Sequence, residues 1–266
     1  MTDRQTADLD MTHAIVLAAG RGSRLDPEEG HKLVVEIGGR TLLSRHLDNF
    51  RRLGVRDVTV VVGYRHPPLE RAIEEHPVPD GMSVFTAVNP AFDGSNGLSV
   101  LAGVRGARRT SGVDRAVPFW LTMGDHVFEP GLFERLAGDL PGAFPDRAGA
   151  VLAVDRKIDT IFDLDDANGL AFDGDRIDRI GKELEGEEMD AVDVGLFGIG
   201  EPFVEALEEQ RRRTGDCDTS DAVRALDGKG RFATWDVGPH TWQDVDTPQA
   251  RAHADELARS WEASGE

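Results

Sequence analysis

Lysine is scarce in this chain of 266 residues, because only four of its 30 basic residues are lysines and the others are arginines. Cysteine occurs once, as Cys217, which excludes an internal disulfide and argues against a disulfide-stabilised secreted fold. No apolar run approaches the ~20 residues of a membrane-spanning helix. The opening segment, MTDRQTADLD, is too polar and acidic for a signal peptide. We therefore expect a cytoplasmic protein that does not span a membrane.

Acidic residues number 49, and the formal net charge is −19. This charge argues against broad binding to nucleic acid or to anionic membranes. Apolar residues make up 39% and charged residues 30%, as in ordinary globular proteins. The acidic, lysine-poor composition is typical of a salt-adapted or a GC-rich source, and composition leaves both open.

The first half of the chain alternates apolar runs with amphipathic segments. Strands are predicted at 14–19, 58–62, 83–88 and 117–123, and helices at 41–53, 68–75 and 97–108. Thr41 is placed to cap the first helix and Gly54 to end it. This alternation predicts a mostly parallel α/β sheet.

After Gly149 the pattern changes to short segments joined by Gly/Asp turns. Strands are predicted at 150–155, 160–164, 169–173, 176–180 and 190–199, which indicates a mixed or antiparallel extension of the sheet. Helices are predicted at 201–213, 218–227 and 247–262, with a strand near 231–237. No linker is evident, so we expect a flexible lead at 1–11 and a single domain at 12–266.

A glycine-rich turn follows the first predicted strand, with Gly20, Gly22 and Arg24, and Lys32 comes soon after it. Such a turn lets backbone N–H groups approach phosphate, and the two cations suit phosphate oxygens. The turn lacks the third glycine of a dinucleotide site and the GK[ST] of a P-loop. A tight turn carrying two surface cations remains the alternative.

Two carboxylates are candidates for a metal site. Asp125 directly follows a mostly apolar strand, where open α/β sheets bind ligands, and Asp244 precedes the last predicted helix. Asp125 could instead cap a turn, and Asp246 or Thr247 could cap the helix ahead of Pro248. Two carboxylates from distant segments would give Mg²⁺ the few protein ligands it prefers.

The four lysines are themselves informative. Lys32, Lys157 and Lys182 stand where phosphate could be bound, and Lys229 lies in a Gly-rich turn. Where arginine has replaced lysine almost everywhere, a retained lysine indicates a need for a compact ammonium group. Chance is the alternative explanation for a sample of four.

Other polar residues have local explanations. Ser95 or Asn96 could cap the helix that follows, or could read a nucleobase edge together with Ser99, and the cap is the local preference. His126 after Asp125 is interpreted as structural. Cys217 lies between two aspartates that do not lower a thiol pKa, so no catalytic role is assigned to it.

Together these segments resemble the nucleotidyltransferases that activate sugar phosphates and alcohol phosphates. The family motifs LAAGxGxRL with a later lysine, and WxDxxTP, stand here as Leu17–Leu25 with Lys32 and as Trp242–Pro248. Within the family, the chain is most similar to CTP:inositol-1-phosphate cytidylyltransferases. That similarity rests on the segments Ser95–Ser99, Gly124–Glu129, Val154–Lys157, Ile180–Leu184 and Ala191–Gly195, and the matches cover about residues 13–255.

The resemblance implies an α/β fold: a Rossmann-like three-layer sandwich with a mixed, mostly parallel sheet. A nucleotide-binding half would span about 12–125 and an acceptor-binding half about 126–250, followed by the C-terminal helix. Arg24 and Lys32 would be catalytic, and Asp125 and Asp244 would bind Mg²⁺. The nucleotide site would comprise Leu17, Ala18, Ala19, Gly20, Gly22, Asn96, Gly97 and Ser99. The acceptor site would comprise Asp155, Arg156, Lys157, Lys182 and Asp193.

The implied reaction is transfer of the cytidylyl group of CTP to inositol 1-phosphate, which gives CDP-inositol, a precursor for a phospholipid or a compatible solute. Arg24, Lys32, Arg156, Lys157 and Lys182 would converge with Mg²⁺ on one cleft, while acids cover the remaining surface. Some family members carry a membrane-embedded phosphotransferase half, and we expect that later step to belong to a separate membrane protein. The oligomeric state is left open.

Several rival functions remain. A cytidylyltransferase for phosphocholine or an aminoalkylphosphonate would need carboxylates or an aromatic cage for the substrate's cation, and the acidic 159–166 segment keeps it open. Transfer of another nucleotide to a sugar phosphate is a further option. A non-catalytic ligand-sensing relative would be expected to lose Lys32, Asp125 or Asp244, yet all three are present. A dinucleotide oxidoreductase is disfavoured by the missing glycine.

Overall fold

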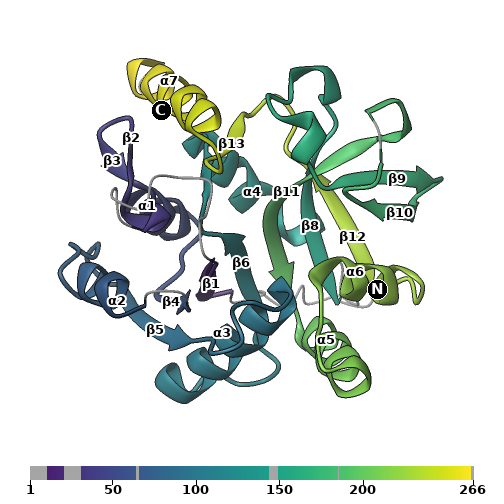
Figure 1. The fold of residues 1–266 in the computed structure, drawn as a ribbon, viewed down its shortest axis with the longest axis horizontal. Helices are drawn as coiled ribbons and strands as arrows, with labels where there is room; N and C mark the ends of the chain where they lie inside the picture. The colour runs from purple at the N-terminus through teal and green to yellow at the C-terminus, as the bar shows by residue number, and fades with distance from the viewer. Residues whose placement is uncertain (1–10, 21–30, 64–65, 144–148, 185, 265–266) are drawn as a thin grey trace, which may run out of the picture.

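The central sheet of this computed structural model has its strands in the order β10-β9-β11-β6-β1-β4-β5, with β8 and β12 attached beside β11 (Figure 1). The structure describes residues 11–20, 31–63, 66–143, 149–184 and 186–264. The predicted flexible lead therefore lies almost entirely outside the described residues.

Four parallel strands form the half of the sheet built from the first part of the chain. These are β1 (His13–Ala18), β4 (Asp57–Val62), β5 (Ser83–Val88) and β6 (Phe119–Met123). The apolar runs of β1, β4 and β6 are largely buried because helices cover both faces of a parallel sheet, whereas β5 lies at the edge of the sheet and is more exposed. The predicted alternation of strands and helices is confirmed here.

Two apolar layers sandwich the sheet. On one face lie α1 (Leu42–Arg52), α2 (His66–Glu74), α4 (Pro130–Ala143) and α7 (Pro248–Ser264), which share a core with Val16 and Val60. On the other face lie α3 (Asn96–Ser111), α5 (Glu201–Thr214) and α6 (Thr219–Asp227), which share a core with Ile15 and Val61. The predicted three-layer α/β architecture is thus present.

Local signals act as expected at the two ends of α1. Thr41 caps α1 by accepting a hydrogen bond from the Ser44 N–H, and Gly54 follows the helix at a φ of 77°. The glycines of α3 do not break the helix but let it approach the sheet. A Cβ at Gly103 would lie 2.6 Å from Ile15 Cγ2, and one at Gly106 would lie 2.5 Å from Ala87 Cβ.

The second half of the chain extends the sheet as a mixed one. It contributes β8 (Ala150–Asp155), β9 (Gly169–Asp173), β10 (Arg176–Gly181), β11 (Ala191–Ile199) and β12 (Phe232–Asp236). Strand β11 runs antiparallel to β6, β8 and β9, and β12 runs parallel to β8. The register of β11 against β8 shifts between Asp193 and Phe197.

The strand expected at 160–164 is absent and that prediction is wrong. Two short 3₁₀ helices, η3 (Ile158–Thr160) and η4 (Leu164–Asp166), occupy this segment instead. The Phe162 ring between them stacks on His253 of α7, with ring centroids 4.4 Å apart. A contact with a distant helix therefore overrides the apolar run Ile161-Phe162.

Short elements that were not predicted complete the fold. They are η2 (Lys32–Val34), β2 (Glu36–Ile37), β3 (Arg40–Thr41), β7 (His126–Phe128), η5 (Gly186–Glu188) and β13 (Trp242–Asp244). Strands β7 and β13 pair antiparallel as a separate ribbon, with Asp244 opposite His126. This pairing brings the segment after β6 next to the segment before α7.

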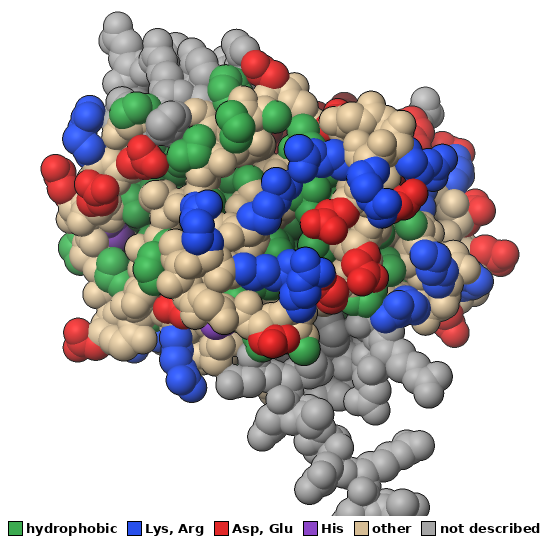
Figure 2. All heavy atoms as spheres, turned by 90° about the horizontal axis from the view of Figure 1, so that it is seen from below, with side chains coloured by type: hydrophobic (Ala, Val, Ile, Leu, Met, Phe, Trp, Pro, Cys, Tyr) green, Lys and Arg blue, Asp and Glu red, His purple; other side chains and the backbone are tan. Residues whose placement is uncertain are grey.

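The surface charge is mixed on the face shown in Figure 2, where Lys and Arg side chains lie among Asp and Glu. Ion pairs such as Arg108–Glu201 and Arg224–Asp221 join helices or neighbouring turns. The expectation that acids cover the surface outside the cleft does not hold on this face. Among the described residues, no helix combines the length and the apolar character needed to cross a membrane.

Candidate active site

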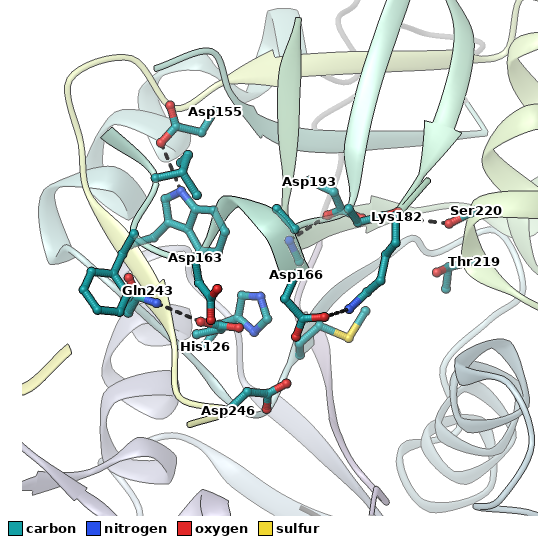
Figure 3. A pocket seen from close by; sticks show the side chains of 18 of the residues that line it. His126, Asp155, Asp163, Asp166, Lys182, Asp193, Thr219, Ser220, Gln243 and Asp246 are labelled. Carbon is teal, nitrogen blue, oxygen red and sulfur yellow. Dashed lines mark hydrogen bonds and ion pairs between the residues drawn. The ribbon is translucent and has the colours of Figure 1, made fainter. Parts of the chain in front are cut away.

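A cavity of about 690 Å³ lies between the ribbon β7–β13, the segment 160–168 and the first turn of α6. Asp163, Asp166, Lys182, Asp193 and Asp246 are among the side chains around it (Figure 3). Asn96 of α3 and Met123 of β6 also line it, so the cavity adjoins the carboxyl end of a central strand. This is where open α/β sheets bind ligands.

Lys32 lies next to Asp246, which lines this cavity, and is held between two carboxylates. Its ammonium donates to Asp125 Oδ2 at 3.3 Å and forms a second ion pair with Asp246. The Lys32 side chain is 15% exposed. Burial lowers the pKa of Lys32, but the charges of Asp125 and Asp246 outweigh burial and raise the pKa above its usual value. Lys32 is therefore a permanent cation at this site.

The short helix η2 fixes the position of Lys32. His31 caps it, with its ring Nδ1 accepting a hydrogen bond from the Leu33 N–H at 3.2 Å. Burial lowers the pKa of His31, which favours the neutral ring that this acceptor role requires. Leu33 is fully buried and anchors the turn in the core. The lysine is thus presented from a rigid element.

Asp125 is oriented from the other side by His126. The His126 Nδ1 lies 3.0 Å from Asp125 Oδ1 and must be the donor, because an ionised carboxylate only accepts. Burial raises the pKa of Asp125, but His126 and Lys32 outweigh burial and hold that pKa well below its usual range. For His126 the directions are reversed. Burial lowers its pKa, but the hydrogen bond to Asp125 and the nearby carboxylates outweigh burial and raise that pKa overall.

Asp244 comes into the same region through the pairing of β13 with β7. Burial raises its pKa, and the charges of Asp246 and Asp125 add to this rise, so these carboxylates lie within electrostatic range of each other. Among the residues that the structure describes, no group of three or more His, Cys, Asp or Glu side chains is arranged to hold a metal. Two carboxylates nevertheless fit Mg²⁺, which uses one or two carboxylates together with substrate oxygens and water.

Asp246 was left as a possible helix cap by the sequence, and the structure gives that role to Thr247. Thr247 Oγ1 accepts from the Ala250 N–H at 3.1 Å, at the start of α7. Asp246 instead pairs with Lys32. The sequence offers one hint of this role, namely that Asp246 is a carboxylate at a position that the WxDxxTP motif leaves open. The contact itself joins residues 214 positions apart, so no local pattern predicts it.

The residues expected at the nucleotide phosphates are partly visible. A small space of about 50 Å³ is lined by Leu17, Ala18, Gly20, Lys32 and Asp125, among others. Ala19 is buried beside them. Gly22 and Arg24 lie outside the described residues. The described part of the predicted phosphate loop thus lies beside Lys32, and its binding role stays a prediction.

The residues expected to read cytosine are engaged within the protein. Asn96 donates to Thr219 Oγ1 at 2.9 Å and accepts from the Thr219 N–H at 3.0 Å, and the buried Ser99 accepts from Asn89 at 2.9 Å. Gly97 packs against the backbone of Cys217, whose oxygen would lie 2.5 Å from a Cβ. These bonds fasten the start of α3 to the start of α6, so Asn96 lines the cavity as part of a rigid wall.

Ser95 precedes α3 as its capping residue, but its side chain does not make the local bond expected of a cap. It donates to Asp216 Oδ2 at 2.8 Å instead. The neighbouring Cys217 is buried, and burial together with Asp216 raises its thiol pKa to about 11. Cys217 is therefore a packing residue, in line with the absence of an assigned catalytic role.

The predicted acceptor residues Asp155, Arg156 and Lys157 behave differently from one another. The Lys157 ammonium donates to Asp155 Oδ1 at 2.8 Å and to the backbone oxygens of Gly238 and His240 at 2.6 and 3.1 Å. Those bonds occupy its three hydrogens. Arg156 is not among the residues that line the cavity, and its guanidinium lies over the Phe172 ring at 4.8 Å. The expected convergence of all cations on one cleft therefore does not include Arg156.

Lys182 and Asp193 do reach the cavity. Lys182 is exposed and pairs with Asp166 at 2.7 Å (Figure 3). Burial raises the pKa of Asp193, although it accepts hydrogen bonds from the Gly195 N–H at 2.7 Å and from Asn168 at 3.1 Å. Both residues line the cavity, and their roles toward an acceptor stay predictions.

The described cavity wall is more acidic than the sequence suggested. Eight aspartates line it, against three Lys or Arg side chains, of which Lys157 is internally satisfied. Phe162 is 48% exposed and adds an aromatic face beside Asp163. The first turn of α6 adds Thr219 and Ser220 (Figure 3), hydroxyls that sequence reasoning did not select. In the sequence, only their place at the start of a predicted helix, near other polar residues, indicated that these two hydroxyls could belong to a site.

A Rossmann-like sheet with a lysine and carboxylates gathered at its strand ends has the arrangement in which open α/β proteins bind ligands. Residues 14–165 match the model of the MobA-like NTP transferase domain. The chain belongs to this family and is a nucleotidyltransferase.

Relatives extend the comparison over the whole chain. The "Bifunctional IPC transferase and DIPP synthase" of Rubrobacter xylanophilus is 32% identical across 100% of this chain and 56% of that protein. The "CMP-5'-(3-aminopropyl)phosphonate synthase" of Streptomyces rubellomurinus is 32% identical across 94% of this chain and 39% of that protein. This chain thus spans about half the length of the first of these relatives and less of the second.

The fold is shared with solved structures. The inositol-1-phosphate CTP transferase from T. maritima superposes with a TM-score of 0.74 at 23% identity, covering 95% of this chain and 96% of that one. This likeness confirms the predicted fold class, a sandwich of helices around a mixed, mostly parallel sheet.

Proposed function

We propose that this chain is a Mg²⁺-dependent cytidylyltransferase that joins CTP and inositol 1-phosphate, giving CDP-inositol and pyrophosphate. The observation that carries the proposal is Lys32, a partly buried cation paired with Asp125 and with Asp246, which lines the cavity. The choice of CTP and inositol phosphate rests on the motif resemblance. It is supported by relatives from three organisms that share the name "Bifunctional IPC transferase and DIPP synthase".

The proposed reaction needs no general base. The acceptor phosphate is already an anion near neutral pH, so one of its oxygens attacks the α-phosphorus of CTP directly. The bond from that phosphorus to the β-phosphate oxygen breaks, and its electron pair leaves with pyrophosphate. The main obstacle is the repulsion between two polyanions, which positive charge at the site must offset.

The described residues have separate parts in this scheme. Lys32 would exchange a carboxylate partner for the α-phosphate and stabilise the charge that develops there. Asp125 and Asp244 would hold Mg²⁺, which when bound supplies charge that polarises phosphate oxygens. Lys182 would meet the acceptor phosphate, and Asp193 would accept a hydrogen bond from a hydroxyl of the acceptor. Arg24 would add charge at the triphosphate.

The test is a matrix of nucleoside triphosphates against alcohol phosphates, with released pyrophosphate as the readout. We expect release only with CTP, only with inositol 1-phosphate and only with Mg²⁺ present. Pyrophosphate release from CTP at a rate that does not depend on which acceptor is added would refute the substrate assignment. Asp125→Asn and Asp244→Asn should each lose activity, whereas Asp175→Asn, in an exposed turn that does not line the cavity, should keep it.

A second candidate is a cytidylyltransferase whose acceptor carries a cation, such as phosphocholine or an aminoalkylphosphonate. The acidic lining of the cavity and the exposed face of Phe162 favour it, because carboxylates and aromatic faces attract ammonium groups. The name of the Streptomyces relative is consistent with this candidate.

The two candidates separate at Asp163. Within the described part of the chain its carboxylate has no hydrogen-bond or ion-pair partner, and it lines the cavity (Figure 3). If the acceptor is cationic, Asp163→Asn should raise the KM for it by about tenfold, the equivalent of one ion pair of roughly 1.4 kcal/mol. Asp165→Asn serves as the control, because Asp165 is exposed and does not line the cavity. With inositol 1-phosphate, neither substitution should raise the KM.

A further inference from the structure

Asp155 is a buried carboxylate whose bonds all lie within the protein. It is 2% exposed, and its Oδ1 accepts from the backbone N–H and the ammonium of Lys157, each at 2.8 Å. Its Oδ2 accepts from Trp242 Nε1 at 3.0 Å (Figure 3). A carboxylate that is buried and bonded on both oxygens is poorly placed to bind a substrate, but it holds Trp242 firmly.

Trp242 in turn supports His126. The two rings stack with centroids 5.5 Å apart and planes only 3° from parallel. The pairing of β13 with β7 sets this stack, because Trp242 lies opposite Phe128 and Asp244 opposite His126. Phe128 stacks on His126 as well, at 6.1 Å. The imidazole is therefore fixed in its plane by aromatic neighbours.

His126 passes this restraint to Asp125. The bond from His126 Nδ1 to Asp125 Oδ1 leaves Oδ2 of the same carboxylate facing Lys32 at 3.3 Å. If the imidazole rotated, the carboxylate would lose its orientation toward Lys32. A chain of direct contacts thus runs from Asp155, at the end of β8, to the lysine at the nucleotide side.

We propose that Asp155, Trp242 and His126 form a positioning array that sets the orientation of the Asp125 carboxylate. These are positioning residues, because Asp155 and Trp242 act on the reacting groups only through His126 and Asp125. This proposal rests on the proposed function in one respect, that Asp125 pairs with Lys32 and binds Mg²⁺ during nucleotidyl transfer. It assigns to Asp155 a different role from binding the acceptor.

The sharpest test is Trp242→Phe, since phenylalanine can still stack on His126 but cannot donate to Asp155. We expect kcat to fall by about 10- to 100-fold, the usual effect of losing a partner that orients a ligand, with the KM for both substrates nearly unchanged. Trp235→Phe is the matched control. Trp235 is buried and, like Trp242, donates its indole N–H to an aspartate, Asp139 at 3.1 Å, but it does not line the cavity. It should keep full kcat.

A double-mutant cycle with Asp155→Asn distinguishes a shared path from general loosening. If Asp155 acts through Trp242, the double variant should be about as slow as the slower single variant, because both changes break the same link. Losses in kcat that multiply would overturn the proposal. So would a Trp242→Phe enzyme that is as fast as Trp235→Phe, or one in which only KM changes.

A readout without substrate separates the array from the proposed reaction. In protein labelled with ¹⁵N-histidine, the Nδ1–H of His126 should give a hydrogen-bonded signal that is assigned by its loss in His126→Gln. We expect the signal to persist in Trp235→Phe and to weaken or shift in Trp242→Phe and Asp155→Asn. Absence of the signal in the unaltered protein, or its persistence in all three variants, would overturn the array whatever substrates the enzyme uses.

Discussion

Replacing Lys32 by arginine keeps the positive charge beside Asp125 and Asp246 but changes the shape of the charged group. The lysine side chain is 15% exposed, and the space beside it amounts to only about 50 Å³. A planar guanidinium is larger and spreads its donors in a fixed fork. We therefore expect the variant to fold with its ion pairs but to misplace charge at the transferring phosphate.

The size of the effect follows from the part proposed for Lys32. Loss of one donor to developing charge costs about 10²- to 10³-fold in rate, or roughly 2.7–4 kcal/mol. Lys32→Ala should show this whole loss, and Lys32→Arg should recover only part of it. The readout is kcat/KM from pyrophosphate release, with thermal unfolding to show that Lys32→Arg remains folded.

The control for this experiment is the same substitution at Lys229, an exposed residue that does not line the main cavity. Lys229→Arg should be as active as the unaltered enzyme. If Lys32→Arg were equally active, a compact ammonium would not be the reason that this arginine-rich chain retains a lysine here.

Three further outcomes are expected. Burial and neighbouring charges raise the pKa of Asp244, so its ionised form lowers the stability of the fold near neutral pH. Asp244→Asn should therefore raise the Tm measured without Mg²⁺ at about pH 7. This gain in Tm should vanish as the pH falls to about 4 and below, where Asp244 is protonated in both the folded and the unfolded state. Gly97→Ala should lower stability by about 1–3 kcal/mol through its clash with Cys217, whereas Gly138→Ala, in an open helical position, should not, as denaturant unfolding would measure. The buried Cys217 thiol, with a pKa of about 11, should resist thiol reagents until the protein unfolds.

Local patterns predicted most of the scaffold. The apolar runs of β1 and β4 could be read directly, because strands buried on both faces need no alternation. Thr41 and Gly54 marked the limits of α1 through capping chemistry. Helix α4 was missed although Pro130 begins it and Leu132, Phe133 and Leu136 form an apolar stripe.

The site was less accessible, because its contacts join distant parts of the chain. Lys32, Asp125 and Asp244 could be chosen from motifs, but the pairing of Asp246 with Lys32 could not. The ribbon β7–β13 has only three residues in each strand, too few for a periodic signal. Two of the three hydrogen bonds of the Lys157 ammonium go to backbone oxygens. Every residue has such an oxygen, so these bonds could not be predicted from residue types.

The ion pair between Lys32 and Asp246 joins residues 214 positions apart, and this has a consequence for the order of assembly. Chains generally begin to fold from the N-terminus during synthesis. The strands β1, β4, β5 and β6 can therefore pair while Asp244 and Asp246 have yet to be made. A nascent chain at that stage would carry Lys32 and Asp125, but neither Asp244 nor the second counter-charge of the lysine, Asp246. Nearly the whole domain must therefore be synthesised before this pairing can form.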